Sequence, residues 1–469
     1  MADGQGLTWN DGYYVEGYSN LGWILLIAAA AALGADPVAA ARILGLVLTG
    51  AVVGAFVVIG RRRGGRSPAM PWLLALGASA HTLAIWAIGG LEQPLVLFCL
   101  FFGYLALAGW REARDHRRLW GASALFGVLA LARLDGILFA GAFSLSILCF
   151  RLPWPHRLSA AARLAALPVA AAAAQVLFRL FYYGAAVPNT ARVKLGFTPE
   201  RVFAGIDYVG DGVLALAPLL AAAMACWLRA GKDRDDALRA GALATLAWVA
   251  YLVAIGGDIF PGFRHFTPVI AIVLVIIVRT QSAASAPGRA GRSTRIGWPS
   301  VRAAAALAVF FAAFQFAVPA HQRAKAERWE WDCRALAATL RDRFEDHEPV
   351  IAVTAAGCLP YWTEFESIDL LGLNDLELPN RRPDDFGAGS LGHELGDLDY
   401  LLERAPDIVV FHVGHAPNFA YRRQVAADPR FAQAYCAVTV DVDAVGERLV
   451  YLHRAFAEEV GAEDGCPAS

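Results

Sequence analysis

Ten strongly apolar runs, separated by short polar segments, occupy about the first two-thirds of the chain. They span residues 38–60, 69–89, 93–109, 117–133, 136–152, 161–181, 213–229, 238–256, 264–279 and 302–319. A helix needs about 20 apolar residues to cross a bilayer, so the shorter runs are expected to extend into their flanks. The pattern predicts a mainly α, polytopic membrane bundle of about 10 transmembrane helices.

A shorter apolar run precedes these ten. Residues 22–34 hold only about 13 apolar positions, too few to cross a bilayer. We expect a half-length helix lying in the outer interface of the membrane. Residues 1–36 are therefore predicted to be an outer loop with an interfacial helix, and the bundle is predicted at 37–319.

The pattern changes at residue 320. Residues 325–344 carry apolar side chains at helical spacing, which predicts an amphipathic helix. Short strands are predicted beyond it, with helical stretches near 395–404 and 418–427. The strand sequences are PVIAVTA, DIVVFHV, YCAVTVDV and RLVYLHR. Residues 320–469 are thus predicted to form a small C-terminal α/β domain.

Composition supports a membrane part followed by a water-soluble part. Hydrophobic residues make up 57% of the chain and charged residues 18%, against about 25% charged in soluble domains. Residues 1–320 hold 27 basic and 15 acidic side chains, and residues 321–469 hold 14 and 27. The sequence contains no zinc-finger spacing and no phosphate loop of the GxxxxGK[ST] type, so no nucleic-acid partner is predicted.

The orientation follows from lysine and arginine in alternating loops. RRRGGR, REARDHRR, RLPWPHR, RAGKDRDDALR and RTQSAASAPGRAGRSTR form the basic set. These loops are predicted to be cytoplasmic, which places the other loops and the C-terminal domain outside the cell's inner (plasma) membrane.

Three cysteines in apolar runs are expected to pack as small hydrophobes. A disulfide is possible among the four in the C-terminal domain, without an assignable pairing. These two groups are Cys99, Cys149 and Cys226, and Cys333, Cys358, Cys436 and Cys466.

The first candidate site is GLTWNDGYYVEGYSNLGW, near the start of the chain. Asn10, Tyr14 and Tyr18 suit sugar binding, because aromatic faces meet sugar C–H groups and polar tips bind hydroxyls. A competing interpretation is an aromatic belt at the membrane interface. Glu16 favours the sugar-binding interpretation, because an aromatic belt does not need a carboxylate.

Three further loops on the predicted outer side carry ionisable residues, which are costly at membrane depth. Arg133 and Asp135 in ARLDG form a candidate pair, or a structural ion pair that caps helix ends. Asp258, Arg264 and His265 in GGDIFPGFRHF form another candidate site. The alternative interpretation is a structural Asp–Arg ion pair.

In YYGAAVPNTARVKLG, Asn189 is expected to cap a helix, with Arg192 and Lys194 at the helix start. There they would bind phosphate or contact lipid headgroups. In SIDLLGLND, a loop docking on the bundle is expected around Asp369, Asn374 and Asp375.

Together these groups fit transfer of a sugar from a lipid phosphate. A carboxylate would accept the proton of the acceptor hydroxyl, and cations would stabilise charge on the departing phosphate. The candidate catalytic residues are Glu16, Asp135 and Asp258. Predicted partners are a polyprenyl-phosphate-linked sugar donor, a glycan, glycolipid or protein acceptor, and the bilayer. No cofactor and no metal ligand are assigned, and divalent-metal dependence stays open.

Five motifs in the same order carry a family resemblance: the N-terminal block, RLDG, YYGAAVPNTARVKLG, GGDIFPGFRHFTP and IDLLGLND. The chain resembles the polytopic GT-C glycosyltransferases, and is most similar to the terminal arabinofuranosyltransferase group of the mycobacterial envelope and its bacterial relatives. The resemblance implies transfer from a polyprenyl-phosphate sugar on the outer side of the membrane. Its motifs match this chain at Glu16, Asp135, Asn189, Lys194, Asp258 and Arg264.

The chain departs from that family at its start. Such proteins have a first transmembrane helix and an outer loop with an acidic pair before the N-terminal block, the pair being the family's catalytic base. This sequence begins inside the block, so we expect a missing first helix and a missing acidic pair. An alternative is therefore a truncated, non-catalytic GT-C-like protein with an envelope or flagellar/polar organisation role. A transporter is disfavoured, because the ionisable groups cluster at the membrane edge rather than at the midplane.

Overall fold

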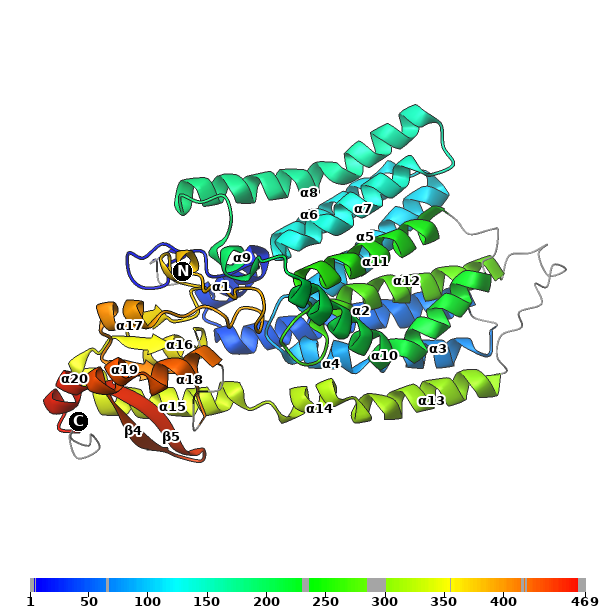
Figure 1. Cartoon of the computed structure of the whole chain (residues 1–469). Helices are drawn as coiled ribbons and strands as arrows, with labels where there is room; N and C mark the ends of the chain where they lie inside the picture. The colour runs from blue at the N-terminus through cyan, green and yellow to red at the C-terminus, as the bar shows by residue number, and fades with distance from the viewer. Residues whose placement is uncertain are drawn as a thin grey trace.

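A helical bundle and a small sheet domain lie at opposite ends of the molecule in the computed structural model (Figure 1). The structure describes residues 4 and 6–462, except 65–66, 230–235, 285–300, 355, 415–416 and 418–419. The bundle consists of α1 (Leu21–Ala32), α2 (Pro37–Gly64), α3 (Met70–Ala78), α4 (His81–Ile88), α5 (Gln93–Ala113), α6 (His116–Ala132), α7 (Ile137–Leu148), α8 (Trp154–Tyr182), α9 (Asn189–Lys194), α10 (Pro199–Arg229), α11 (Asp236–Ile255), α12 (Thr267–Ala284) and α13 (Val301–Ala317).

The apolar helices make the chain a multi-pass membrane protein. Within the described residues, α2, α5, α8, α10 and α11 are long and apolar enough to cross a bilayer. Two bent pairs, α3 with α4 at 42° and α13 with the helices after it at 54°, raise the number to at most seven. Each of the ten predicted apolar runs falls on a helix or a bent pair. The mainly helical membrane fold is confirmed, while the count of ten spans stays a prediction.

Small residues allow the helices of the bundle to approach one another closely. A Cβ atom on Gly241 of α11 would lie 2.3 Å from the hydroxyl of Tyr104 on α5, and that hydroxyl donates to the carbonyl of Ala237 at 2.9 Å. A Cβ on Gly212 of α10 would lie 2.1 Å from the ring of Phe266. Close backbone contact of this kind is how helices associate without a hydrophobic driving force in lipid.

The C-terminal domain is a five-stranded mixed sheet in the order β2-β1-β3-β5-β4. The strands β1 (Ile351–Val353), β2 (Ser367–Asp369) and β3 (Ile408–Val410) are parallel, and β4 (Tyr435–Val442) and β5 (Gly446–His453) add antiparallel. The helices are α14 (Pro319–Ala326), α15 (Trp329–Phe344), α16 (Cys358–Thr363), α17 (Leu398–Arg404), α18 (Ala420–Ala427), α19 (Pro429–Ala434) and α20 (Arg454–Glu459). The predicted small α/β domain is confirmed.

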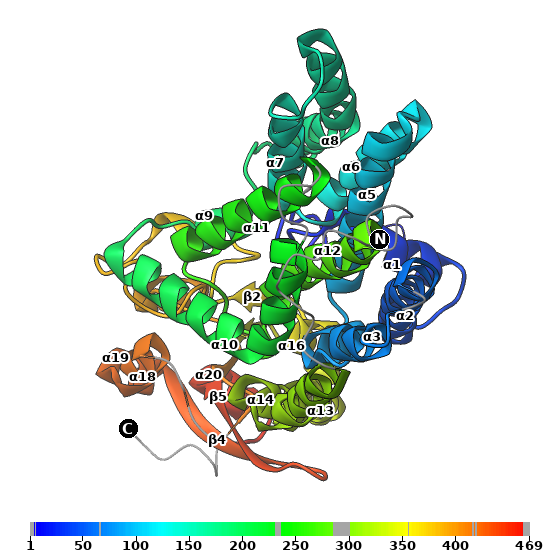
Figure 2. The same cartoon turned by 90° about the vertical axis from the view of Figure 1, so that its right-hand side faces the viewer.

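Two apolar layers hold the sheet. Residues of α15 pack with one face of the strands, including Leu336 and Leu340 against Ile351. Tyr400 and Leu401 of α17 pack on the other face. Figure 2 shows the molecule turned by 90°, seen from the end of the bundle opposite the sheet domain. A sheet covered on both faces is expected for a parallel core, and all three residues of β1 are buried.

The N-terminal loop docks on the C-terminal domain. The side chain of Asn10 donates to the carbonyl of Ser367 at 2.8 Å and accepts from its N–H at 3.1 Å. The indole N–H of Trp9 reaches the same carbonyl at 2.9 Å, and the hydroxyl of Tyr13 accepts from the N–H of Leu376. Side chains of the N-terminal loop are therefore bound to the β2 edge of the C-terminal sheet.

The cysteines follow the predicted division between membrane and soluble parts, with one exception. Cys99 and Cys226 are buried in the bundle, but Cys149 is exposed just beyond the end of α7, so its predicted packing is wrong. Cys333 and Cys358 form a disulfide between α15 and α16. Cys466 lies outside the described residues.

We predict that Cys333 and Cys358 are disulfide-bonded in protein isolated from membranes. The loop they close is 25 residues long, and replacing both with serine should lower the free energy of unfolding by about 3 kcal/mol. Peptide mass spectrometry without reduction checks the bond, and denaturant unfolding checks the energy. Complete alkylation of both thiols before reduction would contradict the assignment.

Candidate functional site

Four segments bring six charged side chains together at the end of the bundle that faces the C-terminal domain. They are the start of α5, the α6–α7 hairpin, the α11–α12 loop and α9. We call this group the charge cluster, and its members are Glu92, Arg133, Asp135, Lys194, Asp258 and Arg264. In the sequence these residues lie up to 172 positions apart, so the cluster is a product of the tertiary fold.

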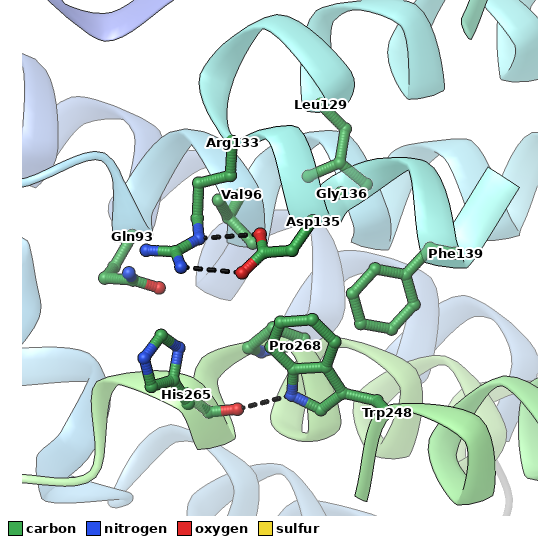
Figure 3. A pocket seen from close by; sticks show the side chains of 10 residues that line it. All are labelled: Gln93, Val96, Leu129, Arg133, Asp135, Gly136, Phe139, Trp248, His265 and Pro268. Atoms are coloured by element: carbon green, nitrogen blue, oxygen red, sulfur yellow. Dashed lines mark hydrogen bonds and ion pairs between the residues drawn. The ribbon is translucent and has the colours of Figure 1, made fainter. Parts of the chain in front are cut away.

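Arg133 links two acids in the centre of the charge cluster. Its guanidinium binds Asp135 through two hydrogen bonds of 2.9 and 2.7 Å and Glu92 through one of 2.6 Å. Figure 3 shows the Arg133–Asp135 pair. Tyr251 donates to Asp135 at 3.2 Å, and Asn20 donates to Glu92 at 2.9 Å. The Arg133–Asp135 pair that the sequence suggested is present, but it is part of a three-residue network.

Glu92 is a member of the charge cluster that sequence reasoning missed. It is 2% exposed and precedes Gln93 at the start of α5. Burial alone would raise the pKa of Glu92, but Arg133 and Arg264 outweigh it and lower the pKa. The sequence did contain a signal for Glu92, which lies in the segment LEQP between two apolar runs. A carboxylate at the edge of the membrane requires a cationic partner.

The Asp258–Arg264 pair is held by a tight loop between α11 and α12. Two hydrogen bonds of 2.7 Å join the guanidinium to the carboxylate. The ring of Phe260 lies 4.4 Å from the guanidinium carbon, a cation–π distance. Gly257 has a φ of +76°, and a Cβ there would lie 2.5 Å from the side chain of Tyr208. The loop therefore needs glycine to bring the pair beside α10.

Lys194 does not lie at the start of a helix, where the sequence analysis predicted it. The helix that carries it, α9, has only six residues, so Arg192 and Lys194 lie in its last turn. Asn189 makes no capping hydrogen bond, because its side chain faces the C-terminal domain. The expected position of these cations at a helix N-terminus is thus wrong, because the helix is so short that both fall in its last turn.

The amine of Lys194 nevertheless belongs to the charge cluster. No carboxylate of the described residues lies within 4.0 Å of it, whereas both arginines of the cluster are paired. Burial, with smaller contributions from Arg264 and Arg133, lowers the pKa of Lys194 to about 8, against the opposing effect of Asp258 and Glu92. The cluster therefore holds a half-buried cation whose charge an added anion would stabilise.

His265 lies beside the charge cluster and is buried, with 4% of its surface exposed. Its backbone carbonyl accepts from the indole of Trp248 at 2.7 Å. These side chains and Arg133 line a tightly packed hollow that leaves no room for a water molecule (Figure 3). Ligand pockets for drug-sized molecules measure about 300–1,000 Å³, so any ligand here would require the hollow to open.

The aromatic candidates near the N-terminus lie beside the end of α8. Glu16 is buried in an ion pair with Arg179, at 2.6 Å, and both side chains are at most 4% exposed. Burial raises the pKa of Glu16, against the effect of Arg179. Tyr18 contacts the hydroxyl of Tyr183 at 3.1 Å, and Tyr14 is half-exposed. The structure brings Glu16, Tyr14 and Tyr18 together at the end of α8, whereas Asn10 is bound to the C-terminal domain.

Asn189 and Arg192 also contact the C-terminal domain. The amide of Asn189 donates to the carbonyls of Gly372, Leu373 and Asp375. Arg192 donates to Asn380 at 2.6 Å. The expected docking of the SIDLLGLND loop on the bundle is confirmed by these bonds. Within the described part of the chain, no group of three or more His, Cys, Asp or Glu side chains is arranged to hold a metal ion.

Comparison with proteins of known structure identifies the fold of this chain. Residues 320–454 match a family model described as a domain of unknown function (DUF8728). No curated protein matches the chain. ArnT from Cupriavidus metallidurans, a GT-C glycosyltransferase, is similar in structure. Its apo form gives a TM-score of 0.54 at 13% identity, covering 94% of this chain and 89% of ArnT. Its form bound to undecaprenyl phosphate gives 0.56 at 13%, covering 96% and 90%. The chain thus has the GT-C fold, and nothing in the comparisons singles out the arabinofuranosyltransferase group.

We predict that Glu16 is required for stability. Glu16→Gln leaves Arg179 buried without a counter-charge and should cost about 3–5 kcal/mol. The double variant Glu16→Met/Arg179→Met should recover most of that loss, because two apolar side chains replace the pair. Thermal unfolding in detergent measures both variants. Wild-type stability of Glu16→Gln would contradict the ion pair as a structural element.

Proposed function

We propose that this protein is a membrane glycosyltransferase that uses a polyprenyl-phosphate-linked sugar. It transfers the sugar to an envelope glycan, glycolipid or protein on the outer side of the plasma membrane. The observation that carries the proposal is Lys194, a half-buried cation beside Arg264 and Arg133 that has no carboxylate partner among the described residues. The shared fold with ArnT, one form of which is bound to undecaprenyl phosphate, supports a lipid-linked donor.

The charge cluster supplies the groups that this reaction needs. The acceptor hydroxyl attacks the anomeric carbon, the bond from that carbon to the phosphate oxygen breaks, and polyprenyl phosphate departs. Lys194 and Arg264 stabilise the charge that develops on the phosphate. Asp258, which faces both cations, accepts the proton of the hydroxyl. Asp135 and Glu92 hold Arg133 in place.

The proposed sidedness in the membrane rests on α2. Arg42 in its second turn pairs with Glu330 of α15 at 2.7 Å, so this end of α2 lies against the C-terminal domain. Arg61, Arg62 and Arg63 lie in the last turn of the same 28-residue helix, about 30 Å from Arg42. Basic loops favour the cytoplasm, which leaves the charge cluster and the domain outside. The Cys333–Cys358 disulfide supports this side, because disulfides persist in oxidising compartments.

The sugar and the acceptor rest on the sequence resemblance alone. Arabinofuranose is the first donor sugar to test, because the motif order resembles that of arabinofuranosyltransferases. The aromatic group formed by Tyr14, Tyr182 and Tyr183 at the end of α8 offers ring faces for sugar C–H groups.

One observation favours a second candidate, a non-catalytic GT-C-like protein with an envelope or flagellar/polar organisation role. Glu16, Asp135 and Asp258 are each bound to an arginine. Such pairing stabilises the ionised carboxylate and reduces its strength as a base. Transfer activity distinguishes the two candidates, since the second binds a lipid phosphate without moving a sugar.

We predict that Lys194→Ala and Arg264→Ala each reduce sugar transfer at least about 100-fold, as expected when a charge-stabilising donor is removed. Membranes that carry the protein are assayed with polyprenyl-phosphate sugars, arabinofuranose among them. Lys325→Ala, which removes an exposed cation of α14, is the matched control and should retain activity. Unchanged transfer in both variants, with folding verified by thermal unfolding, would exclude the assigned phosphate site.

We predict that the affinity for undecaprenyl phosphate falls as pH rises through about 8. The pKa of Lys194 is lowered to about 8, so its amine is charged below that pH and neutral above it. Between pH 7 and pH 9 the affinity should fall about tenfold. Lys194→Arg stays charged over this range and should flatten the profile. A profile that is the same in wild type and Lys194→Arg would show that Lys194 does not bind the phosphate.

A further inference from the structure

The segment that carries Lys194 is held mainly by the C-terminal domain. It comprises residues 189–201, which we call the α9 segment, and it connects α8 to α10. Figure 1 shows α9 between the bundle and the sheet domain. Asn189, Arg192, Thr198 and Arg201 all bond to residues between 372 and 394. Lys194 lies between these anchored positions and makes no such bond.

The first anchor is at Asn189. Its amide, on a side chain that is 4% exposed, donates to three carbonyls of the turn formed by residues 372–375, two of them at 2.7 Å. The turn is itself rigid. Asp369 accepts from the N–H groups of Leu371 and Asn374 at 2.9 and 2.8 Å. A single rigid turn therefore fixes the start of α9.

The second anchor is the ion pair between Arg201 and Glu394, whose side chains are 3% and 5% exposed. The other carboxylate oxygen of Glu394 accepts from the N–H groups of Gly387 and Gly389 at 2.9 and 2.7 Å. Thr198 donates to the carbonyl of Gly387 at 2.7 Å. One carboxylate thus shapes the loop of residues 387–396 and attaches it to the α9 segment.

Between the two anchors, the loop 387–396 packs on Lys194 itself. Gly392 has a φ of +74°, and a Cβ there would lie 3.2 Å from Cε of Lys194 and 3.7 Å from its Cγ. Any side chain at this position would press on the lysine. The backbone of the C-terminal domain therefore packs directly against the stem of Lys194.

We infer that Asn189 and Glu394 are positioning residues through which the C-terminal domain holds Lys194 in the phosphate site. The inference rests on the proposed function for the identity of the anion. It gives residues 320–454, the part that matches a domain of unknown function, a role in completing a site whose other charges come from the bundle.

Loss of an anchor should change the environment of Lys194 measurably. The groups that face its amine are Arg264, Asp258, Arg133 and Glu92 from the bundle and His393 from the covering loop. Burial is the largest cause of the lowered pKa, about 8. An α9 segment released from the domain admits water to the amine, so the pKa should rise toward the ordinary lysine value of about 10.4.

The test measures the pH dependence of amine labelling at Lys194 by mass spectrometry, using the full chain in detergent. Wild type should show a midpoint near 8. Glu394→Gln keeps an oxygen for the N–H groups of Gly387 and Gly389 but loses the charge that binds Arg201. In it and in Asn189→Ala the midpoint should rise by more than about one pH unit. The affinity for undecaprenyl phosphate should fall on the order of tenfold or more.

Glu345→Gln is the matched control, because it removes a carboxylate from an exposed pair with Arg341 in the same domain. It should leave the labelling midpoint and the affinity unchanged. An unshifted midpoint in both Glu394→Gln and Asn189→Ala would overturn the inference. If wild type does not bind undecaprenyl phosphate while the midpoint shifts as expected, the proposed function fails and the positioning of Lys194 by the domain stands.

Discussion

The pairing of charges at the end of an apolar bundle is the constraint on which this site depends. A charge removed from water is costly unless a partner of opposite sign and hydrogen bonds compensate for it. Arg133 is shared by Glu92 and Asp135, and Arg264 is bound through two bonds by Asp258. Among the described residues, Lys194 alone in the cluster lacks such a partner. A site of this kind favours an added anion, and the anion that we propose is a lipid phosphate.

The C-terminal domain stabilises this position of Lys194. A lysine without a counter-ion would turn toward water if its segment were free. Here the segment is fixed by Asn189 on one side and by Arg201 on the other, with the backbone at Gly392 above the lysine stem. The N-terminal loop contributes as well, since Asn10 binds the edge strand of the same domain. Bundle, loop and domain thus form one structure around the charge cluster.

Much of the fold was predictable because its signals are local. The strand YCAVTVDV alternates buried and exposed positions along its length, and its predicted bounds coincide with β4. Each apolar run became a helix for the same reason. The chemistry was less predictable. Asp258 and Arg264 are close in sequence, and their pairing was anticipated. Glu16 binds Arg179, and Arg201 binds Glu394, across 163 and 193 positions, and no local pattern carries such information. The position of Lys194 was misjudged because a six-residue helix cannot be distinguished from the start of a longer one.

The most direct measurement is a structure of the protein in lipid nanodiscs with undecaprenyl phosphate. The account predicts density for the phosphate within about 3 Å of the amine of Lys194, with the guanidinium of Arg264 alongside, distances expected for charge-assisted hydrogen bonds. The lipid chain should leave between the helices of the bundle. A phosphate bound away from Lys194 and Arg264, with the charge cluster unchanged from its lipid-free form, would contradict the central claim.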